Sequence, residues 1–237
     1  MNGPGLEPVP HGLSPDVRLW RVDLDAYAQA VALDGLSPEE EARAARLKYG
    51  QDGRRWRAAR HALRRIVAEI VNAPPESLVI EPDDLGKPRL RESGPQFNLS
   101  HSAGEALIGV SRDRAIGVDI EVVHEVVDAE ALARSHYTNA ERAEWSRAAA
   151  AARDRTFLTC WTRKEACVKA LGVGLSARPA AVEVGCAADA RVVAIRLGTE
   201  SCEVALESLR LTGASVAAVA LATPEAVRLA REFFRRA

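Results

Sequence analysis

The chain has 237 residues, of which 47% are hydrophobic and 27% charged, a composition typical of a globular protein with one large domain or two modest ones. Its formal net charge is −1, which argues against a dedicated nucleic-acid binder because such proteins carry a strong positive field. No run approaches about 20 apolar residues, so no membrane span is expected. The four cysteines form no C-x-x-C pair and are interpreted as buried thiols of a cytoplasmic protein.

The first elements in chain order are a tail, a strand and two helices. Residues 1–15 are rich in Gly and Pro and predict a flexible tail rather than a signal peptide. The partial apolar alternation of residues 17–24 predicts a strand. Ser37 followed by Pro38 and three glutamates is a good helix start. Apolar residues spaced by three or four predict a second helix over residues 52–71.

The remaining elements mix helices with antiparallel hairpins. Strands are expected at residues 78–81, 97–100, 106–111 and 116–123, with a Ser-His-Ser-Ala-Gly loop between the second and third. Helices are expected at residues 129–132, 138–152, 154–171 and 224–234, and short strands between 182 and 221. This order predicts an α+β fold. A boundary near Ala115 would give an N-terminal subdomain of residues 16–115 and a C-terminal one of residues 116–237.

The segment Gly117-Val118-Asp119-Ile120-Glu121 is the first candidate for chemistry. On a strand, Asp119 and Glu121 share a face and repel each other unless a cation lies between them. Carboxylate oxygens suit Mg²⁺. The alternative is a solvated strand face that happens to carry two acids.

The second candidate is residues 161–169, Trp-Thr-Arg-Lys-Glu-Ala-Cys-Val-Lys. On a helix, Glu165 and Lys169 lie one turn apart on one face. The alternative is an exposed ion pair worth only about 0.3–0.5 kcal/mol.

The third candidate is residues 97–102, Phe-Asn-Leu-Ser-His-Ser. Its hydroxyls, amide and imidazole could meet a ligand between two apolar strands. Ser100 and His101 do not form a hydrolase pair, because adjacent strand residues point to opposite faces and no G-x-S-x-G elbow is present.

In this order the three segments closely resemble the motif series of the Sfp-type 4'-phosphopantetheinyl transferases. Gly86-Lys87-Pro88 upstream and residues 172–175 (Gly-Val-Gly-Leu) downstream resemble further family motifs, so the resemblance spans residues 37–175. It implies a pseudo-dimer of two similar α/β subdomains with the active site in the cleft between them. It also implies Mg²⁺-dependent transfer of the phosphopantetheine arm of coenzyme A to a serine of an acyl or peptidyl carrier protein.

The resemblance also assigns roles to residues. Asp119, Glu121 and Glu165 would hold Mg²⁺ beside the coenzyme A diphosphate, and Glu165 is the candidate acceptor for the serine proton. The phosphates and pantetheine would be contacted by Ser100, His101, Lys164 and Lys169, with Lys87 near the nucleotide. Lys164 and Lys169 would also stabilise the charge that develops during transfer.

The basic segment between residues 43 and 65 matches the family more loosely. Arg43 and Arg55 are the best candidates for the 3'-phosphate of coenzyme A, whereas Glu40 stands where relatives carry lysine. The alternative is a solvated helix face whose arginines pair with Glu39, Glu40 and Glu41. Trp145 and Trp161 are interpreted as core or rim residues.

Two other functions remain open from the sequence. The chain could be a degenerate relative that binds coenzyme A or a carrier protein without transferring anything, or a nucleic-acid binder built on the basic segment. The acids and lysines of the motifs argue against the first, and the near-zero net charge against the second. Two halves in one chain make a monomer the expected state, with no membrane partner, and the carrier protein stays unidentified.

Overall fold

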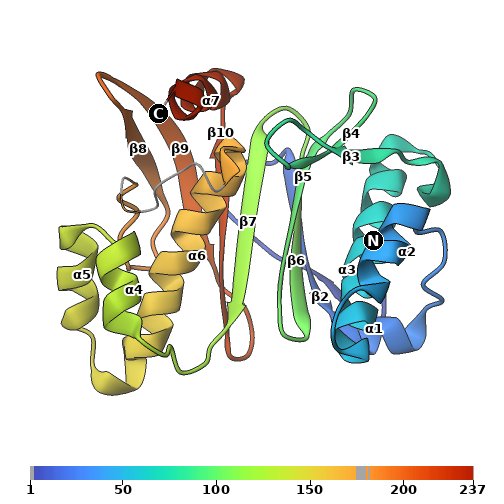
Figure 1. Ribbon diagram of the computed structural model, residues 1–237, viewed down its shortest axis with the longest axis horizontal. Coiled ribbons are helices and arrows are strands. Elements are labelled where there is room, and N and C mark those ends of the chain that lie inside the picture. Colours follow the sequence, from blue (N-terminus) through green and yellow to red (C-terminus); the bar gives the residue numbers. More distant parts are fainter. Residues whose placement is uncertain (1–2, 175–179, 181, 237) are drawn as a thin grey trace.

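The computed structural model describes residues 3–174, 180 and 182–236. Figure 1 shows two sheets side by side in the centre, with helices on the outer side of each. The strand orders are β1-β2-β6-β5 and β7-β10-β9-β8, and β3 and β4 form a separate hairpin. Every paired strand within these sheets is antiparallel, so the predicted α+β class is confirmed.

The helices are α1 (Leu24–Ala30), α2 (Pro38–Ala45), α3 (Gly50–Val71), α4 (Ala129–His136), α5 (Asn139–Ser146), α6 (Arg153–Leu171) and α7 (Pro224–Arg236), with short 3₁₀ turns η1 (Pro75–Ser77) and η2 (Ala150–Ala152). The strands are β1 (Leu6–Pro8), β2 (Val17–Asp23), β3 (Ile80–Pro82), β4 (Pro88–Leu90), β5 (Gln96–Ser102), β6 (Glu105–Ser111), β7 (Ala115–Val122), β8 (Arg191–Leu197), β9 (Glu200–Leu209) and β10 (Ser215–Ala222).

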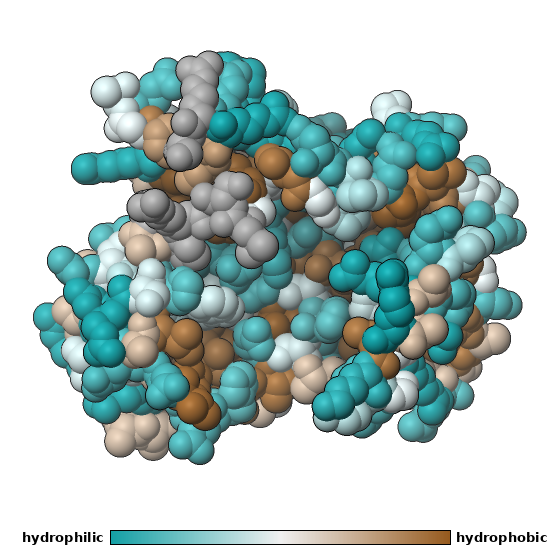
Figure 2. Space-filling view, in the orientation of Figure 1, coloured by the Kyte–Doolittle hydropathy of each residue, from teal (hydrophilic) through white to brown (hydrophobic). Residues whose placement is uncertain are grey.

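Strand alternation divides the apolar side chains among three cores. On β10, Val216 and Ala218 face a core shared with α6 and α7, whereas Ala217 and Val219 face a core between the two sheets. The third core lies between the first sheet and the helices α1 and α3. Because a strand presents successive side chains to opposite faces, apolar residues on both faces build this four-layer arrangement. On the face seen in Figure 2, hydrophilic residues predominate and apolar residues show only in separate areas.

The two sheets meet where β5 lies beside β7, the edge strand of each sheet. Side chains make this junction. The Asn98 Oδ1 accepts the Val118 amide at 2.9 Å, and the Ser102 Oγ accepts the Val122 amide at 3.3 Å. Both bonds join residues 20 positions apart, so β5 and β7 run in the same direction in a fixed register. Polar side chains of one edge thus satisfy backbone donors of the other.

Gly117 brings β7 close to α6. A Cβ atom at this position would lie 2.1 Å from the Ala166 carbonyl oxygen and 2.3 Å from the Ala170 amide nitrogen. Both are backbone atoms of α6 and cannot rotate away. The glycine of the Gly-Val-Asp-Ile-Glu segment therefore sets the strand–helix distance, and Asp119 and Glu121 follow it on the same face of β7.

Several predicted elements are confirmed with small shifts in their ends. Ser37 and Glu40 form the full capping box of α2, and Thr138 with Glu141 does the same for α5. All four cysteines are free and buried, and Trp145 is buried in the C-terminal core with Trp161 packed at its edge. Among the described residues, none of the helices is both long and apolar enough to span a bilayer.

Other predictions were wrong. The expected tail over residues 1–15 contains β1, which pairs with β2 through its backbone and buries Leu6. Short α1 was missed, although Asp23 caps it by accepting the Ala26 amide. The helix predicted over 138–152 ends at Ser146. The expected loop after Ser100 is shorter, because His101 and Ser102 continue β5. Of the Gly-Val-Gly-Leu motif, Leu175 lies outside the described residues.

We expect Gly117→Ala to lower the free energy of unfolding by the upper part of the overpacking range, about 1–3 kcal/mol, because its methyl group must displace helix backbone. Urea denaturation followed by circular dichroism would measure the change. Gly50→Ala is the matched control, since no atom lies within 4 Å of a Cβ there and alanine favours the helix. Equal stabilities of the two variants would contradict the close-approach argument.

Candidate active site

A cluster of acids and one lysine lies at the junction of the two sheets. Asp119 on β7 is 4% exposed, and its Oδ1 accepts hydrogen bonds from the Lys169 ammonium of α6 at 2.5 Å and the Ser100 hydroxyl of β5 at 2.7 Å. The Lys169 ammonium is also 3.2 Å from the Ser100 Oγ. One step further along both strands, the Ser102 hydroxyl donates to the Glu121 Oε2 at 2.6 Å. Three chain segments far apart in sequence thus converge at this point.

The three acids of this cluster share a perturbed electrostatic environment. Burial raises the pKa of Asp119 above its ordinary value, against the opposing effect of Lys169. Burial and the neighbouring charge of Asp119 raise the pKa of Glu121. Burial raises the pKa of Glu165 too, and the charges of Asp119 and Glu121 add to that effect. The carboxylates of Asp119, Glu121 and Glu165 are therefore near enough to repel one another, and a cation placed among them would relieve that repulsion.

The chemistry of this donor set fits a hard divalent cation. The Asp119 Oδ2 is buried and has no hydrogen-bond partner among the described residues, so one carboxylate oxygen is left for a ligand. Within the described residues, no three Asp, Glu, His or Cys side chains already form a metal-binding group. The Lys169 ammonium instead lies against Asp119. An ion here would draw on Asp119, Glu121 and Glu165 together with oxygens from a phosphate ligand.

A cleft of about 960 Å³ opens beside this cluster. Its walls come from the start of α2, from α3, from the β3–β4 hairpin and from β5, so it lies wholly within the N-terminal half. His101, next to Ser100 on β5, lines the cleft, and burial together with the charge of Lys169 lowers its pKa. The sequence predicted one cleft between the halves. The structure instead places this cleft in the first half and the acid cluster at the junction.

The arginines around this cleft differ in their partners. The Glu40 carboxylate forms ion pairs with Arg60 at 2.6 Å and with Arg64 at 2.7 Å, so two of the arginines that line the cleft are already paired. Arg43 also lines the cleft, and its guanidinium lies 5.9 Å from the centroid of the Trp56 ring. Among the described residues no acid pairs with Arg43. The local-partner interpretation therefore holds for Arg57, Arg60 and Arg64, which pair with Glu40 or Glu41. It leaves Arg43 available to an anion.

Arg55 does not join Arg43 in the cleft. Its guanidinium forms a two-pronged ion pair with Asp25 of α1, at 2.9 and 2.5 Å. The two arginines are separated because Arg43 lies on α2 and Arg55 on α3. The structure therefore gives Arg55 a partner of its own, unlike Arg43.

Lys164 lies away from the acid cluster, in contrast to the expectation from the motif. Its side chain is 1% exposed and pairs with the equally buried Glu141 at 2.6 Å. The Lys164 ammonium lies 5.7 Å from the centroid of the Tyr137 ring. Glu141 also accepts the Val184 amide at 2.8 Å. Successive helix residues are rotated by about 100° about the helix axis. Lys164 therefore faces the C-terminal core, whereas Glu165 faces the junction of the two sheets.

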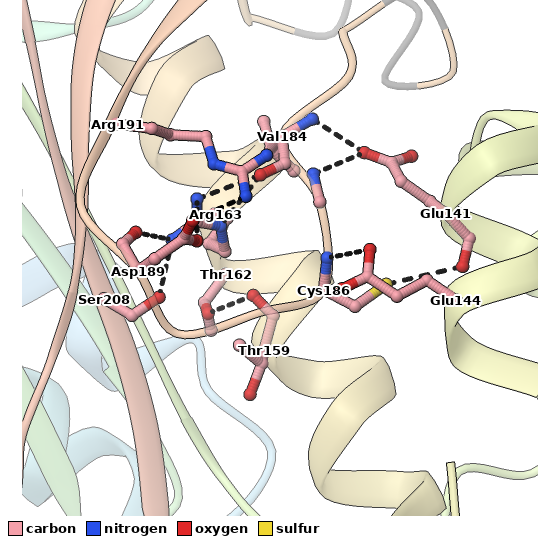
Figure 3. Close-up of polar contacts among 11 residues, drawn as sticks. Glu141, Glu144, Thr159, Thr162, Arg163, Val184, Cys186, Asp189, Arg191 and Ser208 are labelled. Carbon is pink, nitrogen blue, oxygen red and sulfur yellow. Dashed lines mark hydrogen bonds and ion pairs between the residues drawn. The ribbon is translucent and has the colours of Figure 1, made fainter. Parts of the chain in front are cut away.

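Arg163 strengthens the same core and is fully buried. Figure 3 shows its guanidinium among the Val184 and Asp189 carbonyl oxygens and the Ser208 hydroxyl, at 2.9, 2.7 and 2.9 Å respectively. Thus Arg163 holds Val184 and Asp189, and Lys164 pairs with Glu141. From the same motif, Lys169 bonds Asp119, and Glu165 lies close enough to be affected by the charges of both β7 acids. The proposed contact of Lys164 with a ligand finds no support in this placement.

Lys87 also differs from its expected position beside a nucleotide. Gly86 and Pro88 line the cleft, but the Lys87 ammonium turns away and donates to backbone carbonyls of the C-terminal half, those of Ile116 at 3.0 Å and Lys169 at 2.8 Å. Burial lowers its pKa to about 8.

Sequence reasoning missed two polar residues of the junction, Asn98 and Ser102. Their signal was present, because Asn98, Ser100 and Ser102 recur at intervals of two, the period of one face of a strand. Treating His101 and Ser102 as a loop hid this period. The Trp56 ring has the guanidinium groups of Arg43 and Arg60 each 5.9 Å from its centroid, and the apolar spacing that predicted the helix over residues 52–71 gave no sign of these contacts.

Comparison with known proteins assigns both halves. Residues 18–112 match the family model for the N-terminal part of 4'-phosphopantetheinyl transferases, and residues 115–220 match the 4'-phosphopantetheinyl transferase superfamily. The 4'-phosphopantetheinyl transferase HetI of Nostoc sp. is 36% identical over 171 residues, 69% of this chain and 72% of the relative. The chain belongs to the 4'-phosphopantetheinyl transferase superfamily.

Other members of the superfamily are more distant. The transferase psf-1 of Bacillus pumilus is 32% identical, over 60% of each chain. The human L-aminoadipate-semialdehyde dehydrogenase-phosphopantetheinyl transferase is 26% identical over 61% of this chain, which spans only 51% of that protein. Membership in this superfamily confirms the predicted family and enzyme class.

We predict that Lys164→Met lowers the free energy of unfolding by about 3–5 kcal/mol, because it leaves Glu141 charged and unpaired in the core. Guanidinium denaturation of both proteins would measure it. Arg134→Met is the control, since it removes a mostly exposed pair with Glu130 that contributes less than about 1 kcal/mol. A loss at Lys164 as small as at Arg134 would show that the buried pair is not structural.

Proposed function

We propose that this protein transfers the 4'-phosphopantetheine group of coenzyme A to a serine of an acyl or peptidyl carrier protein, with Mg²⁺ as the metal. The observation that carries the proposal is the convergence of Asp119, Ser100 and Lys169 from the three motif segments, with Glu121 and Glu165 beside them. The carboxylate oxygens are suited to bind a hard metal ion, and the neighbouring lysine is suited to bind the diphosphate held by that ion. The named transferase relatives support the reaction class.

In the proposed reaction, the carrier serine attacks the β-phosphate of coenzyme A and 3',5'-adenosine bisphosphate leaves. A bound Mg²⁺ would neutralise charge on the diphosphate oxygens. Lys169 would exchange its bond to Asp119 for one to a phosphate oxygen and stabilise the charge that builds there. Glu165, or a water molecule that it holds, is our candidate for the group that accepts the serine proton.

The cleft supplies a place for the nucleotide end. Arg43 would bind the 3'-phosphate, because it is the cleft arginine without an acidic partner among the described residues. His101 at the edge of the cleft would contact a phosphate as a neutral donor, in keeping with its lowered pKa. We further infer that the protein acts as a monomer in the cytoplasm, where its four free cysteines stay reduced.

We expect Asp119→Asn and Glu165→Gln each to lower the transfer rate on the order of a hundredfold or more, because each removes a carboxylate from the cation site. Mass spectrometry of a panel of apo carrier proteins, incubated with coenzyme A and Mg²⁺, would measure transfer. Asp113→Asn, which neutralises an exposed loop acid, is the matched control and should retain full activity.

The same assay separates the proposal from its alternative. Removal of divalent ions with a chelator should abolish transfer, and added Mg²⁺ should restore it. Normal turnover by either acid variant would disprove the metal assignment. A wild-type protein that binds coenzyme A in calorimetry but modifies no carrier of the panel would favour the non-catalytic binding module.

Arg43→Ala should raise the KM for coenzyme A about tenfold to a hundredfold with a smaller effect on kcat, because a hydrogen bond to a charged group contributes about 1.5–3 kcal/mol. Steady-state kinetics at several coenzyme A concentrations would show it. Arg55→Ala is the comparison, since Arg55 is already bonded to Asp25. A larger KM effect at Arg55 than at Arg43 would reverse our assignment of the phosphate contact.

A further inference from the structure

The turn between β3 and β4, residues 83–87, connects the N-terminal half to the helices of the C-terminal half. The Lys87 ammonium donates to the backbone oxygens of Ile116, Lys169 and Ala170, at 3.0, 2.8 and 3.4 Å. Ile116 begins the buried part of β7, and the other two carbonyls end α6. One cation from the first half therefore touches both elements that carry the acid cluster.

The turn is built to hold this lysine in place. The Asp83 Oδ1 accepts the amides of Leu85 at 3.0 Å and Lys87 at 2.9 Å, which fixes the turn from inside. The Asp83 Oδ2 meets the Arg231 guanidinium of α7 at 2.5 Å, and Arg231 also donates to the Leu171 carbonyl at 3.4 Å. Figure 1 shows the β3–β4 hairpin at the same end of the molecule as α7 and the last turn of α6.

We propose that Lys87 is a positioning residue for the transfer reaction, holding α6 and β7 in the arrangement that places the Lys169 side chain against Asp119. This inference rests on the proposed function. Its basis is that the carbonyl bonded by Lys87 belongs to Lys169 itself, the residue whose side chain bonds Asp119 at 2.5 Å. A cation at the end of a helix also complements the negative pole of its dipole.

Burial of the Lys87 ammonium costs free energy of folding, and this cost supports a role for the lysine beyond folding. Burial lowers its pKa from 10.5 to about 8, so the folded protein binds the proton less tightly than the unfolded chain does. Between those values the unfolded state holds more protons, and this group's contribution to stability therefore rises with pH and is least favourable below pH 8. A buried apolar side chain would avoid that cost.

The test is Lys87→Met, which keeps an unbranched side chain and removes the three donors. We expect kcat to fall on the order of tenfold to a hundredfold with the KM for coenzyme A within about twofold of wild type, because misplacement of reacting groups slows chemistry rather than binding. Hydrogen exchange of the amides at the end of α6 should be faster in the variant. Arg210→Met, which removes an exposed cation, is the control and should change neither.

Each other outcome has a defined meaning. A raised KM with unchanged kcat would overturn the proposal in favour of direct nucleotide contact, and unchanged kcat and exchange would overturn it outright. Should Lys87→Met fail to fold, Asp83→Ala loosens the same turn and should lower kcat in the same direction. An unchanged kcat in that variant would also overturn the proposal. Failure of the wild-type protein to modify any carrier would instead count against the proposed function.

Discussion

The close approach of β7 to α6 at Gly117 is the constraint on which the site depends. Without a side chain at this position, strand and helix backbones come near enough for Asp119 to reach Lys169 at 2.5 Å. Any larger residue would push the helix outward and separate the two charges. The same strand meets β5 on its other side, where Ser100 and Ser102 bond Asp119 and Glu121. The short strand β7 therefore brings its own acids together with the serines of β5 and with Lys169 of α6.

The acid cluster is poorly satisfied as it stands. Asp119 is buried with one oxygen lacking a partner among the described residues. Burial, with a smaller effect of neighbouring carboxylates, raises the pKa values of Glu121 and Glu165. Buried polar groups cost free energy unless they are paired, so a fold selected for stability alone would not keep this arrangement. The nearby pair of Lys164 and Glu141 is the contrast, because Glu141 is bonded on both carboxylate oxygens.

Sequence reasoning identified the α+β fold and the long helices because their capping and periodicity are local signals. It failed where pairing partners decide the structure: β1 is a strand only because β2 lies beside it, and residues 101–102 are strand because β6 pairs with them. For the site, helical geometry alone would have separated Lys164 from the face of Glu165 and Lys169. The partners of Lys87 and Arg55 could not be predicted, because they lie on elements far away in the sequence.

In the function that we propose, binding and chemistry are divided between the halves of this fold. The large cleft is lined entirely by residues of the first half, whereas all three acids and Lys169 belong to the second. A ligand held in the cleft can react only if the halves keep a fixed relation to each other. The apolar core between the sheets maintains it together with three kinds of polar contact: β5 side chains on β7 amides, Lys87 on helix carbonyls, and Asp83 with Arg231. Because these contacts join different pairs of elements, they fix the two halves to each other at more than one place.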